Sequence, residues 1–179
     1  MEEIVKTVSE KISSYNIFNN LLPGIVFCYL LNKTTRFSIV GENILENVFI
    51  YYFTGMVISR IGSLCIEELL KKIKVKKKEP FLKRATYIDY IKASSVDACI
   101  GTLSETNNTY RTAVSLFCLL IVVNLFDSLM YDFVKMHINA ELRIIIAFVA
   151  LMLLFVMSYR KQTKLISERV EAHKINNQE

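Results

Sequence analysis

The sequence is poor in the residues that many folds need for their turns. It contains no tryptophan, 5 glycines and 2 prolines among 179 residues. Because β-sandwiches and β-barrels need many tight turns, this scarcity argues against both classes. It also excludes a collagen-like chain and a disordered chain rich in glycine and proline. A chain of long, uninterrupted elements remains, and we predict an all-α fold.

Cysteine and histidine are few and scattered, which argues against a metal centre. The sequence has no Cys-x-x-Cys pair, and its candidate ligands are far apart: Cys28, Cys65, Cys99, Cys118, His137 and His173. A zinc site or a disulfide framework requires clustered residues. We therefore expect no metal and no disulfide framework, and we interpret the cysteines of apolar stretches as small buried hydrophobes.

No catalytic motif is present. The chain lacks Gly-x-Ser-x-Gly, His-Glu-x-x-His, a phosphate-binding loop and Gly-x-Gly-x-x-Gly. His173 lies with Arg169 in a polar tail, where a solvated helix end is a simpler interpretation than a nuclease-like pair. We expect that the protein is not an enzyme and uses no cofactor.

Apolar residues dominate the composition and are segregated from the charged ones. They make up 53% of the chain, charged residues make up 22%, and the mean hydropathy is +0.34. The apolar residues form four segments at about 17–31, 44–66, 113–129 and 138–159. This pattern predicts a four-transmembrane-helix bundle. The first segment is short and contains Pro23-Gly24, so we expect it to be kinked or to start in the interface.

The sequence outside the four apolar segments predicts helical extensions on the cytoplasmic side. Residues 1–16 have the spacing of an amphipathic helix, which packs either on the protein or in the membrane interface. Residues 67–112 form a basic helical region between the second and third spans, and residues 160–179 form a tail. The second helix is expected to continue through Glu67 and Glu68. Capping-type residues predict that the third helix begins before the bilayer: Ser104, Thr106, Asn107 and Asn108.

Positive charge predicts the orientation. Of the 22 Lys and Arg residues, ten lie in 67–112, and the tail adds five more. The other two connections offer little beyond Lys33, Arg36 and Lys135. The positive-inside rule then places both termini and the central region in the cytoplasm.

Polar residues inside apolar segments are candidate functional groups, because they cost free energy there. Asn124, Asp127 and Ser128 form a stripe near the outer end of the third segment, which faces either a partner helix or an aqueous path. If there is a path, these three residues are its lining. Arg60, in the second segment, either extends toward Glu67 or Glu68 or faces a vestibule.

Small residues recur on the second segment. Gly55, Ser59 and Ser63 are spaced by four, which is a small-xxx-small stripe that permits close helix packing. The pattern leaves open whether the contact lies within one chain or between subunits.

A dense basic run follows the second segment and contains a single acid, Glu79. We define it as the basic segment, with eight basic residues: Lys71, Lys72, Lys74, Lys76, Lys77, Lys78, Lys83 and Arg84. It could set topology, bind anionic lipid headgroups or bind nucleic acid or a nucleotide through phosphate contacts. Aromatic residues for base stacking lie nearby at Phe81, Tyr87 and Tyr90.

Four stretches carry a family resemblance over nearly the whole chain: NNLLPGIVFCYLL, FIYYFTGMVISRIGSLCIEELLKK, YIKASSVDACIGTLSETNNTYRT and FVMSYRKQTK. Together they resemble small bacterial four-helix membrane proteins of antiphage defence, most of all the membrane effectors of Hailong systems. The membrane component of Kiwa systems is an alternative. Since none of the stretches is a catalytic motif, the resemblance extends to architecture and assigns no residue roles.

The resemblance implies a function that can be stated as an expectation. In Hailong systems a partner nucleotidyltransferase makes single-stranded DNA oligomers, which hold an oligomeric membrane effector closed until they are released. We accordingly expect a homo-oligomeric effector of the bacterial inner membrane, a gated pore controlled by an anionic ligand on the basic face. The alternative is a non-conducting membrane anchor that recruits a cytoplasmic partner through residues 67–112.

Overall fold

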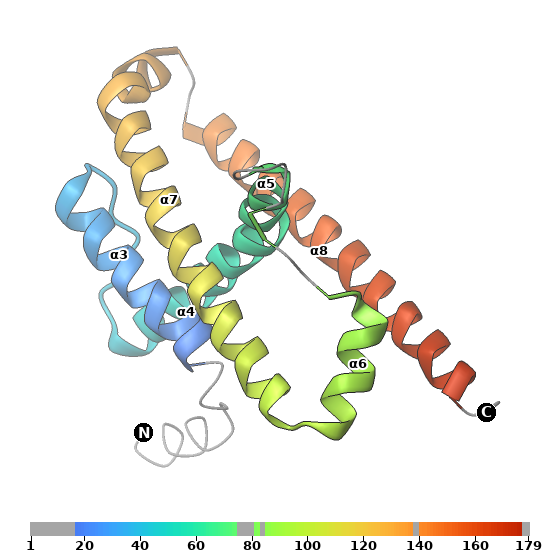
Figure 1. Cartoon of the computed structure of the whole chain (residues 1–179). Helices are drawn as coiled ribbons and strands as arrows, with labels where there is room; N and C mark the ends of the chain where they lie inside the picture. The colour runs from blue at the N-terminus through green and yellow to red at the C-terminus, as the bar shows by residue number, and fades with distance from the viewer. Residues whose placement is uncertain (1–16, 75–80, 83–84, 138–139, 177–179) are drawn as a thin grey trace.

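The part of the chain that the structure describes folds into helices, as the sequence predicts. The computed structural model describes residues 17–74, 81–82, 85–137 and 140–176 (Figure 1). The elements in chain order are η1 (Ile17–Leu21), α3 (Leu22–Thr34), α4 (Ile44–Ile61), η2 (Gly62–Ile66), α5 (Glu67–Lys72), α6 (Tyr87–Val96), α7 (Cys99–His137) and α8 (Ala140–Asn176). The all-α class is confirmed for these residues. The predicted amphipathic helix at 1–16 lies outside them.

Two helices are long and apolar enough to cross a membrane, not the four that we predicted. Among the described residues these are Ile44–Lys72, which is α4, η2 and α5 in one continuous rod, and Cys99–Lys135 of α7. The 13 residues of α3 reach only about 20 Å, against a hydrocarbon core of about 30 Å. The turn η1 directly before α3 adds five residues, but two of them are the buried polar residues Asn19 and Asn20. The apolar part of α8, Ile145–Arg160, is also too short by this measure.

The exposure of the two long helices favours lipid as their surroundings. Only 22% of the apolar window of Ile44–Lys72 and 17% of that of Cys99–Lys135 are buried. The core helix of a soluble protein would be mostly buried. The buried apolar core is small and gathers where α3, α4 and α7 meet: Phe27, Cys28, Leu31, Ile58, Leu116 and Leu120. This exposure is weak support for a membrane location.

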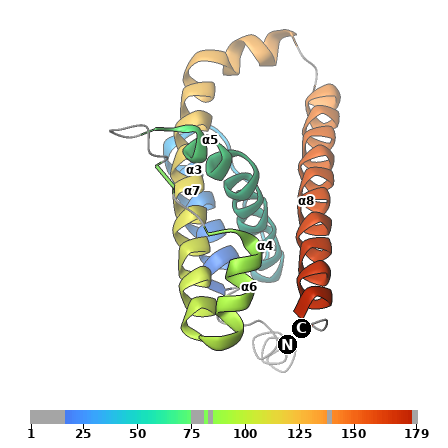
Figure 2. The same cartoon turned by 45° about the vertical axis from the view of Figure 1, so that its right-hand side comes forward.

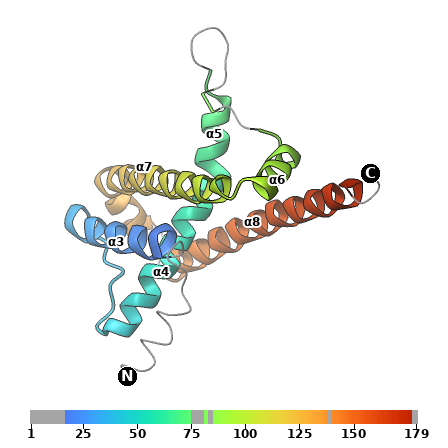
Figure 3. The ribbon, with the colours of Figure 1, turned by 60° about the horizontal axis from the view of Figure 1, so that its bottom comes forward.

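The long rod α4–α5 crosses its neighbours steeply instead of running alongside them (Figures 1 and 3). By contrast, α3 lies along α7. The crossing is close because Gly24 and Gly55 let two backbones touch. A Cβ atom on Gly24 would overlap the carbonyl oxygen of Tyr51, and one on Gly55 would overlap that of Asn20. The predicted bundle of side-by-side helices is therefore wrong for α4.

Helix α8 stands apart from α3 and α7 (Figures 2 and 3) and contacts α6 and α4. One such contact is between the rings of Phe53 and Phe155, whose centroids are 6.1 Å apart. The helix continues to Asn176, so much of the predicted tail at 160–179 is part of α8.

The region before the third segment is divided differently from our prediction. Helix α6 begins after Thr86, whose hydroxyl accepts a hydrogen bond from the Asp89 backbone N–H at 3.2 Å. It ends at Val96, and α7 starts at Cys99, whose N–H donates to the Asp97 carboxylate at 2.9 Å. The predicted capping residues 104–108 therefore lie inside α7, where the Thr106 hydroxyl donates back to the Thr102 carbonyl.

Candidate functional site

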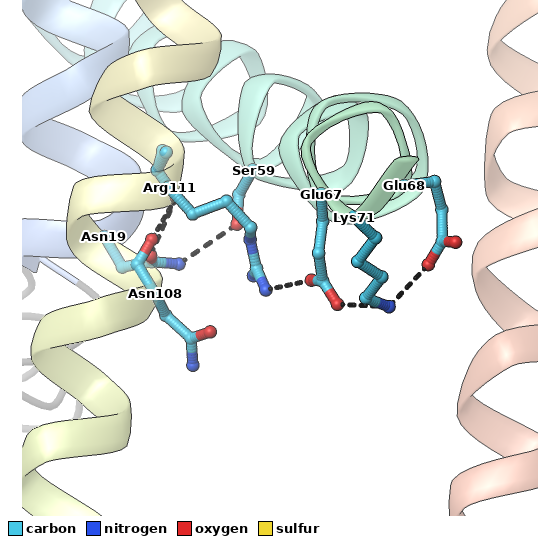
Figure 4. A network of polar contacts seen from close by, with 8 residues as sticks. Asn19, Ser59, Glu67, Glu68, Lys71, Asn108 and Arg111 are labelled. Atoms are coloured by element: carbon cyan, nitrogen blue, oxygen red, sulfur yellow. Dashed lines mark hydrogen bonds and ion pairs between the residues drawn. The ribbon is translucent and has the colours of Figure 1, made fainter. Parts of the chain in front are cut away.

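A buried polar layer joins three helices near the point where the long rod crosses α7 (Figure 4). Asn19 of η1 is its centre: its amide donates to the Ser59 hydroxyl at 3.2 Å, and its carbonyl oxygen accepts from the Thr112 hydroxyl at 3.0 Å. The three side chains are almost fully buried. Polar groups in an apolar setting require such partners, so the layer fixes η1, α4 and α7 against one another.

A second contact fixes α4 on α7 one turn further along. The Ser115 hydroxyl donates to the Ile58 carbonyl at 2.9 Å, and Ser115 is completely buried. Gly62 faces the same part of α7, since a Cβ atom there would lie 3.2 Å from the Ser115 Cβ and 3.3 Å from the Arg111 carbonyl oxygen. Gly62 therefore marks the face of the rod that touches α7.

The π-helical turn η2 brings Glu67 onto that face. The backbone N–H of Glu67 donates to the Gly62 carbonyl, five residues earlier. In an α-helix, residues five apart lie about 140° from each other around the axis. The wider π-turn places them nearly one above the other. As a result the Glu67 side chain points at α7.

Glu67 is the centre of a chain of ion pairs (Figure 4). Its carboxylate oxygens lie 2.9 Å from Arg111 Nη1 and 3.0 Å from Lys71 Nζ, and Lys71 Nζ lies 2.7 Å from Glu68 Oε1. The Glu67 side chain is only 4% exposed, so its charge depends on these cations. The sequence offered Glu67 or Glu68 as partners for Arg60, with a vestibule as the alternative, and it did not identify the Glu67–Arg111 pair.

The sequence reasoning missed four residues of this site: Asn19, Arg111, Thr112 and Ser115. Arg111 and Thr112 immediately precede the apolar stretch of α7, and Ser115 follows one helical turn later. That spacing was a usable signal, because polar residues at the start of an apolar helix need partners. The role of Asn19 depends on a contact 93 residues away, which no local pattern reveals.

The basic segment begins at this site. Lys71 belongs to both, whereas Lys72 and Lys74 are exposed. The backbone N–H of Phe81 donates to the Ile73 carbonyl at 2.9 Å, so Ile73 and Phe81, on either side of the lysine run, lie next to each other. The remaining predicted ligand-binding residues lie outside the described residues: Lys76, Lys77, Lys78, Lys83 and Arg84.

The predicted pore-lining residues engage the end of α3. Asp127 Oδ1 lies 3.1 Å from Arg36 Nε, and the Asn124 amide donates to the Thr34 hydroxyl at 3.0 Å. Ser128 is exposed. The sequence left open whether this stripe faces a partner helix or an aqueous path. Within the chain, Asn124 and Asp127 both have a protein partner.

Arg36 makes three further contacts near Asp127. It reaches Asp132 at 3.2 Å, donates to the Asp127 backbone carbonyl at 2.6 Å and lies over the Tyr131 ring at 4.0 Å. Desolvation lowers the pKa of the guanidinium, but the hydrogen bonds and negative charges of the two aspartates outweigh it, so the pKa is raised on balance. Arg36 therefore stays cationic and ties the 35–43 connection to α7.

The small-residue stripe packs inside the chain. Gly55 contacts the Asn20 backbone and Ser59 accepts from Asn19, both in η1. Ser63 is half-buried in η2. The close contact that the stripe permits is thus with η1, at least at its first two positions.

The described residues include no group of three or more His, Cys, Asp or Glu side chains that could hold a metal ion. The four cysteines are free thiols. No family model matches the chain, and no curated protein and no solved structure matches it either.

Proposed function

We propose that the protein is a homo-oligomeric membrane effector with a gated path for ions. An anionic ligand bound to the basic segment controls the gate, and a single-stranded DNA oligomer is the ligand that we favour. The two long, largely exposed apolar helices support a membrane location. The basic segment begins in the last turn of one of them, so that ligand binding acts on a membrane helix.

The observation that carries the proposal is the ion-pair chain from the basic segment to α7. Lys71 contacts Glu67, and Glu67 contacts Arg111 at the crossing of the two long helices. A device that only set topology or attracted lipid would need exposed lysines. Lys71 instead pairs with Glu67, a carboxylate buried between two helices. A ligand that binds Lys71 would therefore act on the contact between these helices.

In this proposal the polar stripe of Asn124, Asp127 and Ser128 is the lining of the gated path. Within one chain, the Asn124 amide donates to the Thr34 hydroxyl and Asp127 pairs with Arg36. Opening would release the end of α3 from α7 and free the polar stripe. A single chain has too narrow a core to enclose a channel, so the path would form among several copies around an axis.

The resemblance to antiphage effectors supplies the biological setting of the proposal. A partner nucleotidyltransferase would supply the DNA oligomers, and loss of the oligomers during infection would open the effector. The net charge of +5 and the eight cations of the basic segment suit a polyanionic ligand.

Expression in bacteria tests the pore. Without its ligand the effector should collapse the membrane potential, measured with a potential-sensitive dye. The double variant Asn124→Leu/Asp127→Leu should depolarise cells less, because it removes the polar lining. Normal polarisation in cells that contain folded wild-type protein in the membrane would contradict the proposal.

Binding measurements test the ligand. The variant with Lys74, Lys76, Lys77 and Lys78 all changed to Glu should lose affinity for single-stranded DNA and show a flatter salt dependence. Lys92→Glu, in α6 and outside the basic segment, is the control that changes charge elsewhere. An unchanged affinity and salt slope in the fourfold variant would refute a DNA-binding role for the segment.

The second candidate is a non-conducting anchor that recruits a cytoplasmic partner through residues 67–112. The satisfied contacts of Asn124 and Asp127 favour it, since polar residues bonded within one chain need no aqueous path. The anchor predicts a normal membrane potential and a phenotype that is lost when residues 67–112 are replaced.

A further inference from the structure

Lys71 is part of the basic segment, yet its ammonium group is already occupied by two carboxylates. It lies 3.0 Å from Glu67 Oε1 and 2.7 Å from Glu68 Oε1, in the i,i+4 and i,i+3 positions of one helix (Figure 4). Its side chain is 36% exposed, so it is accessible from solvent while it holds this position. Lys72 and Lys74, the neighbouring cations that the structure describes, are more exposed.

The two carboxylates differ in their surroundings. Glu67 is buried and also contacts Arg111 of α7, whereas the Glu68 side chain is 50% exposed. A change at Glu68 therefore alters the charge around Lys71 without removing the contact between α5 and α7. A change at Glu67 affects both.

We infer that Lys71 is shared between the basic segment and the buried Glu67–Arg111 pair, so that an anionic ligand competes with Glu67 and Glu68 for its ammonium group. The inference rests on the proposed function, and it names how that site is regulated. A phosphate that recruits Lys71 takes one cation away from Glu67, which holds α5 against α7. Ligand binding and the contact between the two long helices are then coupled, and the coupling is reciprocal.

The sign of the coupling follows from the competition. Removing a competing carboxylate frees Lys71 and should tighten ligand binding. Glu68→Gln is the cleanest change because the residue is half-exposed. Because an exposed ion pair is weak, loss of the competing Glu68–Lys71 pair should raise the affinity for the ligand by about two- to fivefold. Glu105→Gln, at an exposed position in the N-terminal half of α7, adds the same net charge without touching Lys71.

The test measures binding of a fluorescently labelled single-stranded DNA oligomer to the full-length protein in nanodiscs of zwitterionic lipid. Glu68→Gln should bind about two- to fivefold more tightly than the matched control Glu105→Gln. In a Lys71→Met background the gain from Glu68→Gln should vanish. Equal affinities of Glu68→Gln and Glu105→Gln, or a gain that persists without Lys71, would overturn the inference while leaving the proposed ligand intact. Absence of DNA binding by the wild-type protein would instead refute the proposed function, and this inference with it.

Discussion

The close backbone contact of α4 with α3 and η1 predicts that glycine-to-alanine substitutions lower the stability by different amounts. An alanine at Gly55 would place its Cβ atom 2.6 Å from the Asn20 carbonyl carbon and in overlap with its oxygen. Backbone atoms cannot turn away as a flexible side chain can, so the two helices would have to separate by about 1 Å or more to restore van der Waals contact. Gly24 faces the Tyr51 carbonyl in the same way.

The cost of Gly55→Ala follows from that separation. Overpacking alone costs about 1–3 kcal/mol. The separation also lengthens the hydrogen bond from Asn19 to Ser59, which is worth about 1 kcal/mol in a membrane setting. We expect a loss of about 3 kcal/mol or more in the free energy of unfolding.

Two other glycines provide the controls. Gly62→Ala meets the Ser115 Cβ at 3.2 Å, a contact that small shifts can relieve, so we expect a loss of about 1 kcal/mol. Nothing lies within 4 Å of a Cβ atom at Gly101. Gly101→Ala should leave stability unchanged or raise it by up to about 1 kcal/mol, because alanine favours the helix.

Thermal and SDS-induced unfolding of the purified proteins in mild detergent, followed by circular dichroism, would measure the series. The expected order of stability is Gly101→Ala, then Gly62→Ala, then Gly55→Ala. If Gly55→Ala were as stable as the wild-type protein, or less affected than Gly101→Ala, the described crossing of α4 over η1 and α3 would be wrong. Should Gly55→Ala fail to fold, the order of the other two variants still tests the reasoning.

Three further predictions concern the polar contacts and the orientation. Asn19→Leu should lower the free energy of unfolding by about 1–2 kcal/mol, measured in the same detergent assay, because it removes bonds to two helices; no loss would contradict the role of Asn19 as the centre of the layer. Arg36→Met should speed hydrogen exchange of the 35–43 connection, because the tie to Asp127 is lost; unchanged exchange would mean that other contacts hold it. Cys99, kept as the single cysteine, should react with a membrane-impermeant maleimide in inverted vesicles, and labelling only in right-side-out vesicles would reverse the proposed orientation.

Local patterns predicted the helices well where one signal dominated. The apolar run 113–129 lies inside α7, and the second helix does continue through Glu67 and Glu68 to Lys72. Apolar composition, however, does not fix the number of spans: the first segment is helical from Ile17 to Thr34 but includes the buried Asn19 and Asn20 of η1. Nor does it fix the angle between helices. The steep crossing of α4 depends on Gly24 and Gly55 meeting backbones distant in sequence.

The candidate site shows the same limit. Sequence reasoning identified Asn124 and Asp127 as polar residues that need partners, and it identified Arg36 only as a charge for topology. That Arg36 pairs with Asp127 across 91 residues could not be read from spacing. Glu67 was expected to pair, but its partner depends on the extra residue of the η2 turn, which rotates it toward Arg111. A one-residue change of helical register has no clear sequence signal.

The most direct test of the proposed function is ion flux through liposomes that contain the purified protein. We predict that the ligand-free protein passes ions, that a single-stranded DNA oligomer reduces the flux, and that the double variant Lys72→Glu/Lys74→Glu conducts with a weaker response to the oligomer. Absence of flux with and without the oligomer, in liposomes shown to contain folded and inserted protein, would contradict the gated path and favour the membrane anchor.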